Sequence, residues 1–359
     1  MSTRSTTPAA GAALTSGEAR TYAAYSKPLW QRVLLTREFA IIAALVAVYA
    51  FSYVRVENFD GPLTLYYLFL DVAPILLIAL PMTMIIVTGE IDLSVASVVG
   101  LSSVLVGILH VDAGLSLPMA ALVAMTVGAV AGAVNGFLVA YVGLPSLAVT
   151  IGTLALYRGI AVGLLGTEAK TDFPEKWTDL AKQRIVEGQP YPWILLVVAV
   201  LLHFSTFGRG VFEIGLNDEA ARFSGVDVAR TKLVLFVLAG TISAFAGVYY
   251  TLRYGSARGD NATGMELQVI AAVLLGGVSI FGGRGALHGV LAGVLLIGVV
   301  TSAMRFNTDL VDKIQIVVGV LLVLSVVSPS FLSWASGLIR GRTGLRSRST
   351  AGTGKRSLP

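Results

Sequence analysis

Long stretches of the chain contain no Asp, Glu, Lys or Arg and are rich in Leu, Val, Ala and Ile. A helix needs about 20 apolar residues to cross the hydrocarbon layer of a bilayer, so these stretches predict membrane-spanning helices. One stretch, 113–157, must fold back once, and Gly143-Leu144-Pro145 marks the break because proline disfavours helix at the residue before it. The predicted helices cover about 39–56, 65–88, 93–109, 117–139, 144–165, 192–207, 233–252, 266–281, 286–304 and 313–333.

The ten predicted helices define an all-α polytopic membrane protein. Several are shorter than a full crossing, which predicts tilted, broken or re-entrant segments. Residues 88–98 and 263–273 are similar, and identical residues stand at four corresponding positions: Thr88 and Thr263, Gly89 and Gly264, Ala96 and Ala271, Val98 and Val273. The two stretches fall on opposite sides of the predicted topology, as in an inverted repeat of spans 2–5 and 7–10. Chance similarity between Ala- and Val-rich helices is the alternative explanation.

Composition agrees with a membrane protein. Hydrophobic residues make up 55 % of the chain before glycine is counted, and charged residues make up 13 %, about half the ~25 % of soluble domains. A soluble globule of this size cannot bury so much apolar surface, which excludes a soluble enzyme, a nucleic-acid-binding module and a disordered protein. The chain has no cysteine and only three scattered histidines. We therefore expect no disulfide, no metal site and no catalytic residue.

Basic residues set the predicted orientation. An even number of spans places both ends of the chain on one side, and that side holds most of the 26 Lys and Arg residues. The positive-inside rule then makes both termini cytoplasmic. The predicted parts are a disordered N-tail at 1–36, a membrane domain at 37–335 and a basic C-tail at 336–359. Within the membrane domain, loop 208–232 is expected in the cytoplasm and loop 166–190 outside.

Two short segments place acidic residues between long apolar stretches. Asp92 and Ser94 separate spans 2 and 3, and Glu266 opens the corresponding segment of the second half. Such residues predict broken helices that line a cavity, with Ser94 capping the next half-helix. A short cytoplasmic turn with an ordinary cap is the alternative for Asp92 and Ser94.

Polar residues also occur inside the predicted spans. Asn135 in span 4 is a candidate for the translocation path, although a hydrogen bond between helices is the commoner role of such a residue. Arg158 in span 5 either lines a polar path or extends its charged head to the outer interface. Gly128, Gly132 and Gly136, four residues apart, indicate close packing of span 4 against another helix.

The cytoplasmic loop 208–232 contains a predicted short amphipathic helix. Asn217 is a suitable N-cap and Gly225 a suitable C-cap, and apolar residues alternate with charges between them. A helix of this kind can dock into a groove of a soluble partner. A solvated linker is the alternative.

Four stretches together resemble the permease subunits of bacterial ABC importers for monosaccharides, the ribose/galactose/xylose permease family. They are Gly89-Glu90-Ile91-Asp92-Leu93-Ser94-Val95, residues 134–139 with 144–153, residues 217–225 and residues 276–285. The resemblance extends over about 39–334. Glu90 stands where this family usually has glycine, and Pro145-Ser146-Leu147 replaces Pro-Phe-Ile. Both departures are similar to variants in the subgroup that handles rhamnose or autoinducer-2.

The resemblance implies the permease subunit of an ATP-driven importer of a monosaccharide or sugar-like solute. The chain has no Gly-x-x-x-x-Gly-Lys-Ser/Thr loop, so it is not expected to be an enzyme, and ATP and Mg²⁺ would be bound by a partner. Implied partners are ABC ATPase subunits, an extracytoplasmic sugar-binding protein, a second copy or sister permease, and lipid of a bacterial cell membrane; no nucleic acid is expected. The implied ATPase-coupling residues are Asn217, Glu219, Ala220, Ala221, Ser224 and Gly225, and the candidate path or gate residues are Asp92, Ser94, Asn135 and Glu266.

Two other functions remain open from the residues alone. An ion-coupled secondary transporter would use Asp92 or Glu266 as its titrating group. A non-transporting membrane scaffold would only dock a soluble partner through loop 208–232. A membrane enzyme has the least support, since no nucleophile or metal-ligand motif is present.

Overall fold

The computed structural model describes residues 37–182, 184–186, 189–190 and 206–327. This part of the chain is helical apart from connections and one small hairpin of β1 (Arg184–Val186) and β2 (Gln189–Pro190). The first helices are α2 (Arg37–Arg55), α3 (Thr64–Val87), α4 (Val95–Gly107) with a π-helical turn at Ile108–Asp112, α5 (Leu117–Ala140), α6 (Ser146–Leu165) and α7 (Glu175–Lys182). The others are α9 (Thr206–Leu216), α10 (Asp218–Phe223), α11 (Val228–Tyr254), α12 (Met265–Leu275), α13 (Leu287–Arg305), α14 (Thr308–Val311) and a helix over 314–327.

Seven helices in the described residues are long and apolar enough to cross a membrane, and α2 and α12 are shorter apolar helices. An all-helical polytopic protein is therefore confirmed. The predicted span 266–281 is too long, because α12 ends at Leu275 and the chain turns at Gly277, which has a φ of 91°. The sixth predicted span, 192–207, and both predicted tails lie almost entirely outside the described residues.

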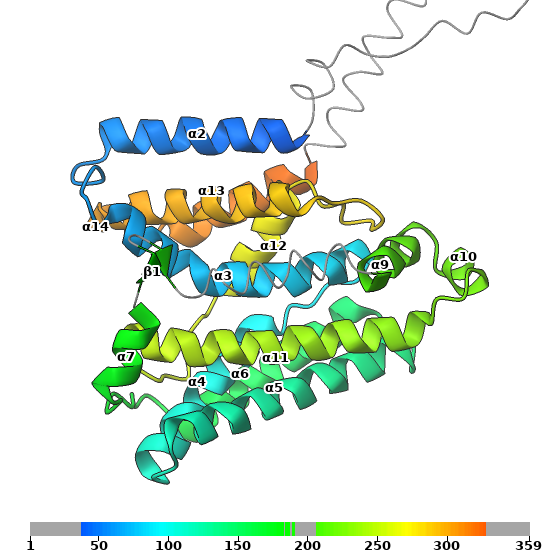
Figure 1. The fold of residues 1–359 in the computed structure, drawn as a ribbon, viewed down its shortest axis with the longest axis horizontal. Coiled ribbons are helices and arrows are strands. Elements are labelled where there is room, and N and C mark those ends of the chain that lie inside the picture. The colour runs from blue at the N-terminus through cyan, green and yellow to red at the C-terminus, as the bar shows by residue number, and fades with distance from the viewer. Residues whose placement is uncertain (1–36, 183, 187–188, 191–205, 328–359) are drawn as a thin grey trace, which may run out of the picture.

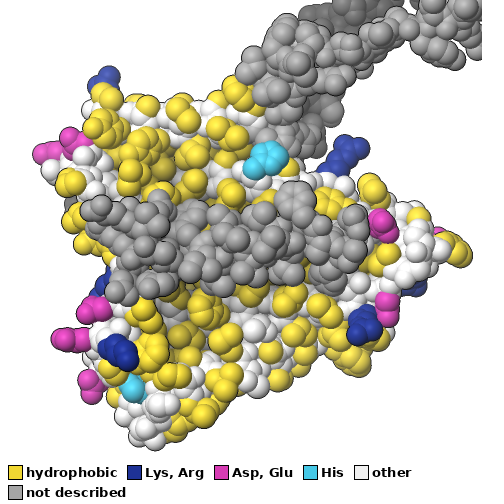
Figure 2. Space-filling view, in the orientation of Figure 1, with side chains coloured by type: hydrophobic (Ala, Val, Ile, Leu, Met, Phe, Trp, Pro, Cys, Tyr) yellow, Lys and Arg dark blue, Asp and Glu magenta, His cyan; other side chains and the backbone are white. Residues whose placement is uncertain are grey.

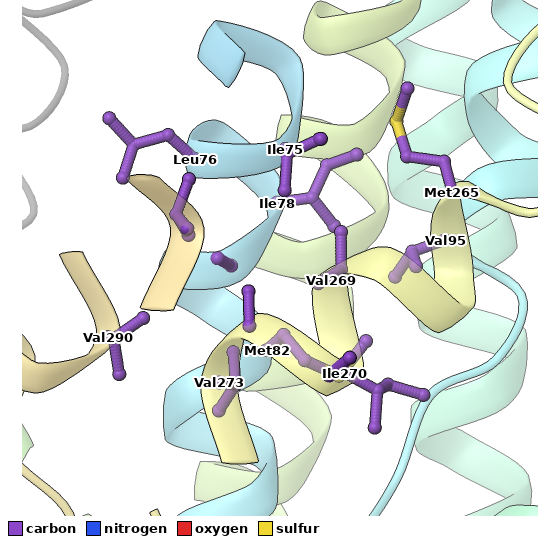
Figure 3. Close-up of a cluster of buried hydrophobic side chains, with 14 of the residues drawn as sticks. Ile75, Leu76, Ile78, Met82, Val95, Met265, Val269, Ile270, Val273 and Val290 are labelled. Atoms are coloured by element: carbon purple, nitrogen blue, oxygen red, sulfur yellow. The ribbon is translucent and has the colours of Figure 1, made fainter. Parts of the chain in front are cut away.

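The helix α3 forms the centre of the bundle. It lies between α13 on one side and α11 on the other, with α2 beyond α13 and α5 beyond α11 (Figure 1). Buried side chains of α3, among them Ile78 and Met82, pack against Val269 and Val273 of α12 (Figure 3). α3 is almost wholly buried although it is apolar on all sides, as expected for an inner helix of a membrane bundle.

Close packing of α5 against α11 is confirmed. A Cβ atom added at Gly132 would overlap the carbonyl of Phe236, and one added at Gly240 would overlap the carbonyl of Gly128. Small residues allow the two backbones to approach this closely. Figure 2 shows hydrophobic side chains over the middle of the described surface and charged side chains at the two ends of the helices.

α4 and α12 each begin after a non-helical segment, and these segments lie at opposite ends of α11. Glu90 in residues 88–94 is bonded to Lys232, in the second turn of α11. The other segment, residues 255–264, follows directly after the last residue of α11. The bundle therefore has one broken segment at each end.

Candidate functional site

The helix α10 forms as the sequence predicts at its start. Asn217 is extended, and its Oδ1 accepts a hydrogen bond from the backbone N–H of Ala220 at 2.9 Å. Asp218 and Glu219 occupy the first turn, where negative charge is favourable. The C-cap is Ser224, one residue before the predicted Gly225, which takes the left-handed conformation that follows many helices (φ 88°).

The two faces of α10 differ. Ala221 is buried against Ile214 and Val228, so it holds α10 to α9 and α11. Glu219, Ala220 and Ser224 are exposed. Phe223, one of the apolar residues of the predicted amphipathic helix, is 92 % exposed, and two further apolar side chains that the pattern did not single out, Leu216 and Phe281 (89 % exposed), are exposed as well. Leu216 lies beside the glycine-rich turn that carries Phe281, and large apolar side chains exposed close together are typical of a surface that binds another protein.

An ion cluster joins α10 to the first broken segment. The Lys232 Nζ lies 2.8 Å from Glu90 Oε1 and 2.9 Å from Asp218 Oδ2. The Lys232 side chain is only 11 % exposed and that of Glu90 18 % exposed, so these charges are poorly screened by solvent. The cluster also explains Glu90, whose carboxylate is one of the two partners of this buried ammonium.

Backbone contacts join the same region. The N–H of Gly283 donates to the carbonyl of Val87 at 2.9 Å. A Cβ atom at Gly215 would overlap that same carbonyl, and one at Gly282 would lie 2.9 Å from its oxygen. The end of α3, the end of α9 and the glycine-rich turn before α13 therefore meet at a single peptide group.

Three predicted path residues form one buried cluster. Asp92 Oδ1 accepts hydrogen bonds from the Ser94 N–H at 2.8 Å and the Ser94 hydroxyl at 2.6 Å. Asn135 Nδ2 donates to the Ser94 hydroxyl at 2.8 Å, which ties α5 to the start of α4. The prediction that the Ser94 side chain caps α4 is wrong, because its hydroxyl is bonded to Asp92 instead. All three side chains are at most 1 % exposed.

The backbone of the first broken segment is bonded by side chains of α6. Ser146 Oγ accepts from the N–H of Ile91 at 3.2 Å, and Thr150 Oγ1 donates to the Ile91 carbonyl at 3.3 Å. Irregular backbone at membrane depth needs such partners, since no bulk water is available there. Ser146, like Glu90, departs from the family pattern, so both departures stabilise residues 88–94.

Arg158 makes hydrogen bonds inside the bundle. Its Nη1 donates to the carbonyls of Gly259 and Asn261 at 2.8 and 2.7 Å, and its Nη2 donates to the carbonyl of Ala96 at 3.1 Å. The guanidinium is therefore held by protein carbonyls, two of them in the non-helical segment at the end of the bundle. Its guanidinium links the second broken segment to α4, across a position where Gly100 leaves room for it.

The second broken segment borders a polar cluster at its own end of the bundle. Asp71 accepts hydrogen bonds from Arg305 at 2.8 Å and from the Tyr254 hydroxyl at 3.1 Å. Arg258 and Asp260 form a bidentate pair at 2.8 and 2.9 Å, and this pairing lowers the pKa of Asp260. The predicted Glu266 is half-buried in the first turn of α12, and within the described residues it makes no hydrogen bond to Asp92, Ser94 or Asn135. No three His, Asp or Glu side chains converge as a metal site in the described residues.

Sequence reasoning singled out the residues of α10 and of the Asp92 cluster, but it assigned no ionic partner to Lys232, Asp218 or Asp71. A basic residue in the first turns of an apolar span was the available signal for Lys232. Asp71, inside the second predicted span, was the corresponding signal at the other end.

Comparisons with known proteins identify related sequences. Residues 64–326 match a family described as "Branched-chain amino acid transport system / permease component". The Autoinducer 2 import system permease protein LsrD of Yersinia enterocolitica is 37 % identical over 265 residues, which cover 71 % of this chain and 80 % of that protein. The proteins of the same name from Photorhabdus luminescens and Yersinia pseudotuberculosis are each 36 % identical, over 71 % of this chain and 79 % of theirs. No solved structure matches the chain.

Proposed function

The chain belongs to this family of ABC importer permeases, and from that premise we propose that it moves autoinducer 2, or a closely similar furanose-like solute, into the cell. Membership confirms the resemblance found in the sequence. The chain is a multi-pass transport subunit and not an enzyme, and ATP is bound by a partner ATPase. An importer of this kind also implies a binding protein that delivers the solute.

The observation that carries the choice of solute is the identity of 36–37 % with the LsrD proteins across about four fifths of their length. The printed family description names branched-chain amino acids, a different class of solute. Both departures from the sugar-permease pattern, Glu90 and Ser146, bond in or to the first broken segment. These contacts are consistent with a specialised member of the sugar-like group.

The exposed face of α10 is the proposed docking site of the ATPase. Glu219 and Ala220 face outward on this helix, and the apolar side chains of Leu216 and Phe223 are exposed beside them. Phe281 is exposed in the glycine-rich turn that meets the end of α9. The ATPase would hold α10 through these side chains, while Ala221 anchors it to the permease. This end of the bundle is then cytoplasmic, in agreement with the distribution of basic residues, and both termini would lie on that side.

The ion cluster supplies a path from the ATPase to the membrane segment. Movement of α10 displaces Asp218, and Lys232 connects Asp218 to Glu90. Glu90 lies two residues from Asp92, whose cluster with Ser94 and Asn135 fixes the start of α4. We therefore assign these residues to the gate that responds to ATP hydrolysis, with a permease dimer around the pathway. Residues 88–94 and 255–264, at opposite ends, support the inverted repeat.

Reconstituted uptake tests this function. The permease is placed in liposomes with its ATPase and binding protein, and uptake of autoinducer 2 is compared with uptake of L-rhamnose, D-ribose and L-leucine. We expect ATP-dependent uptake of autoinducer 2, which stops with an ATPase variant unable to hydrolyse ATP. Preferential uptake of leucine would contradict the proposed identity of the solute. Uptake that is driven by an ion gradient and needs no ATPase would show that the protein is a secondary transporter and not an ATP-driven importer.

A further inference from the structure

A polar cavity opens at the end of the bundle opposite to α10. It has a volume of about 290 Å³ and lies between α3, the end of α11, residues 258–268 and α13. This volume is at the lower limit of the roughly 300–1,000 Å³ of small-molecule sites, so it suits a solute of five or six carbon atoms. Four parts of the chain that are distant in sequence converge on this space.

The charges around the cavity are already paired with one another. Asp71 accepts bonds from Arg305, from Arg253 at 3.4 Å and from Tyr254, and Arg258 is paired with Asp260. A charged group of either sign entering the cavity would lie beside a like charge of these pairs. A neutral hydroxyl can share the remaining lone pairs and N–H groups without breaking a pair.

The cavity also presents an unused amide and aromatic rings. The side chain of Gln268 lines it, is half-buried, and makes no hydrogen bond within the part of the chain that the structure describes. The rings of Tyr250 and Tyr254 lie 4.5 Å apart, centroid to centroid, at the same wall. A half-buried amide without a partner gains a hydrogen bond when a polar ligand enters.

We propose that this cavity is a low-affinity receiving site for a neutral, polyhydroxylated solute of furanose or pyranose size. The proposal rests on the proposed function, because that function makes this end the outer one. A branched-chain amino acid fits poorly, since little apolar wall is available for its side chain. Affinity must be low, because a site on a transport path has to release what it binds.

A cysteine placed in the cavity tests the proposal directly, because the natural chain contains none. Thr263 is exposed and lines the cavity, so Thr263→Cys reports on its occupancy. The rate of labelling by a membrane-impermeant thiol reagent is measured on the full-length permease in nanodiscs, with and without autoinducer 2 or D-ribose at millimolar concentrations. Thr171→Cys is the matched control, since Thr171 is exposed but lies outside the cavity.

We expect at least one of the two polyhydroxylated probes to slow labelling at 263 but not at 171, and L-leucine to have no effect. Adding Gln268→Ala should raise the concentration needed for half-protection about 2- to 10-fold, the range that one net hydrogen bond supplies. Thr167→Ala, which shortens an exposed polar side chain outside the cavity, should leave that concentration unchanged.

Equal labelling of position 263 with and without both probes would contradict the proposed receiving site. So would protection that Gln268→Ala does not weaken, or equal protection by leucine. ATP-dependent uptake by the reconstituted complex separates this failure from failure of the proposed function. If uptake of autoinducer 2 persists while labelling is unprotected, only the receiving site is rejected.

Discussion

Lys232 connects α10 to the first broken segment, residues 88–94, through two ion pairs. Its ammonium lies between the carboxylates of Asp218 and Glu90, and its side chain is 11 % exposed. Removing it would leave Glu90 largely buried without an opposite charge. The cost of such an orphaned group is about 1–3 kcal/mol or more.

Replacing Lys232 with Met should uncouple ATP hydrolysis from uptake. We expect uptake per ATP to fall about tenfold, within the usual range of a coupling free energy, while the ATPase still co-purifies through α10. Lys232→Arg should restore most of the coupling. Arg230→Met is the matched control, because Arg230 lies in the same part of α11 but is exposed. Unchanged coupling in Lys232→Met would remove the proposed link.

Arg158 gives a second prediction, on stability. Arg158→Leu removes three hydrogen bonds from a half-buried cation and leaves carbonyl groups without a donor. We expect the free energy of unfolding in detergent to fall by about 3 kcal/mol. Arg258→Leu, which loses only an exposed pair, should cost at most about 1 kcal/mol. Equal thermal melting of the two variants would contradict this assignment.

Among the elements, α5 and α11 show how far a sequence pattern determines packing. Three glycines at four-residue spacing predicted a close approach, and the backbones of α5 and α11 do meet at Gly132 and Gly240. The helix ends were harder to predict. α12 is shorter than predicted because its end is a glycine turn inside an apolar stretch, where no polar residue marks the boundary.

The glycine contact predicts opposite effects of one substitution at two positions. Gly240→Ala should lower the free energy of unfolding by about 1–3 kcal/mol, because the new methyl group would overlap the Gly128 carbonyl. Gly152→Ala in α6 meets no described atom within 4 Å. It should be neutral or raise stability by up to about 1 kcal/mol through helix propensity. Thermal melting of both purified variants tests the contrast, which equal melting temperatures would refute.

At the scale of the whole molecule, long-range pairs were beyond sequence reasoning. Lys232 and Glu90 are 142 residues apart, and Arg305 and Asp71 are 234 residues apart. Apolar stretches show that helices exist, but they do not say which charged end contacts which. The prediction that the Ser94 side chain caps α4 failed for a local reason. Ser94 stands at a helix start but also close to the Asp92 carboxylate, and its hydroxyl donates to that carboxylate instead.

Whole-molecule topology yields a final prediction. Glu219→Cys and Thr263→Cys lie in segments that the proposed orientation puts on opposite sides of the membrane. In spheroplasts, in which the outer face of the cell membrane is accessible, an impermeant thiol reagent should label position 263 only. Inside-out vesicles should reverse the pattern. Labelling of both positions from one side would contradict the orientation and the inverted repeat together.

The exposed Leu216, Phe223 and Phe281 have a consequence for how cells must produce this subunit. A chain made in excess of its ATPase would present these side chains to the cytoplasm, where chaperones and proteases recognise apolar surface. Its abundance would then follow that of the ATPase, so that surplus copies are degraded and the two subunits accumulate in a fixed ratio.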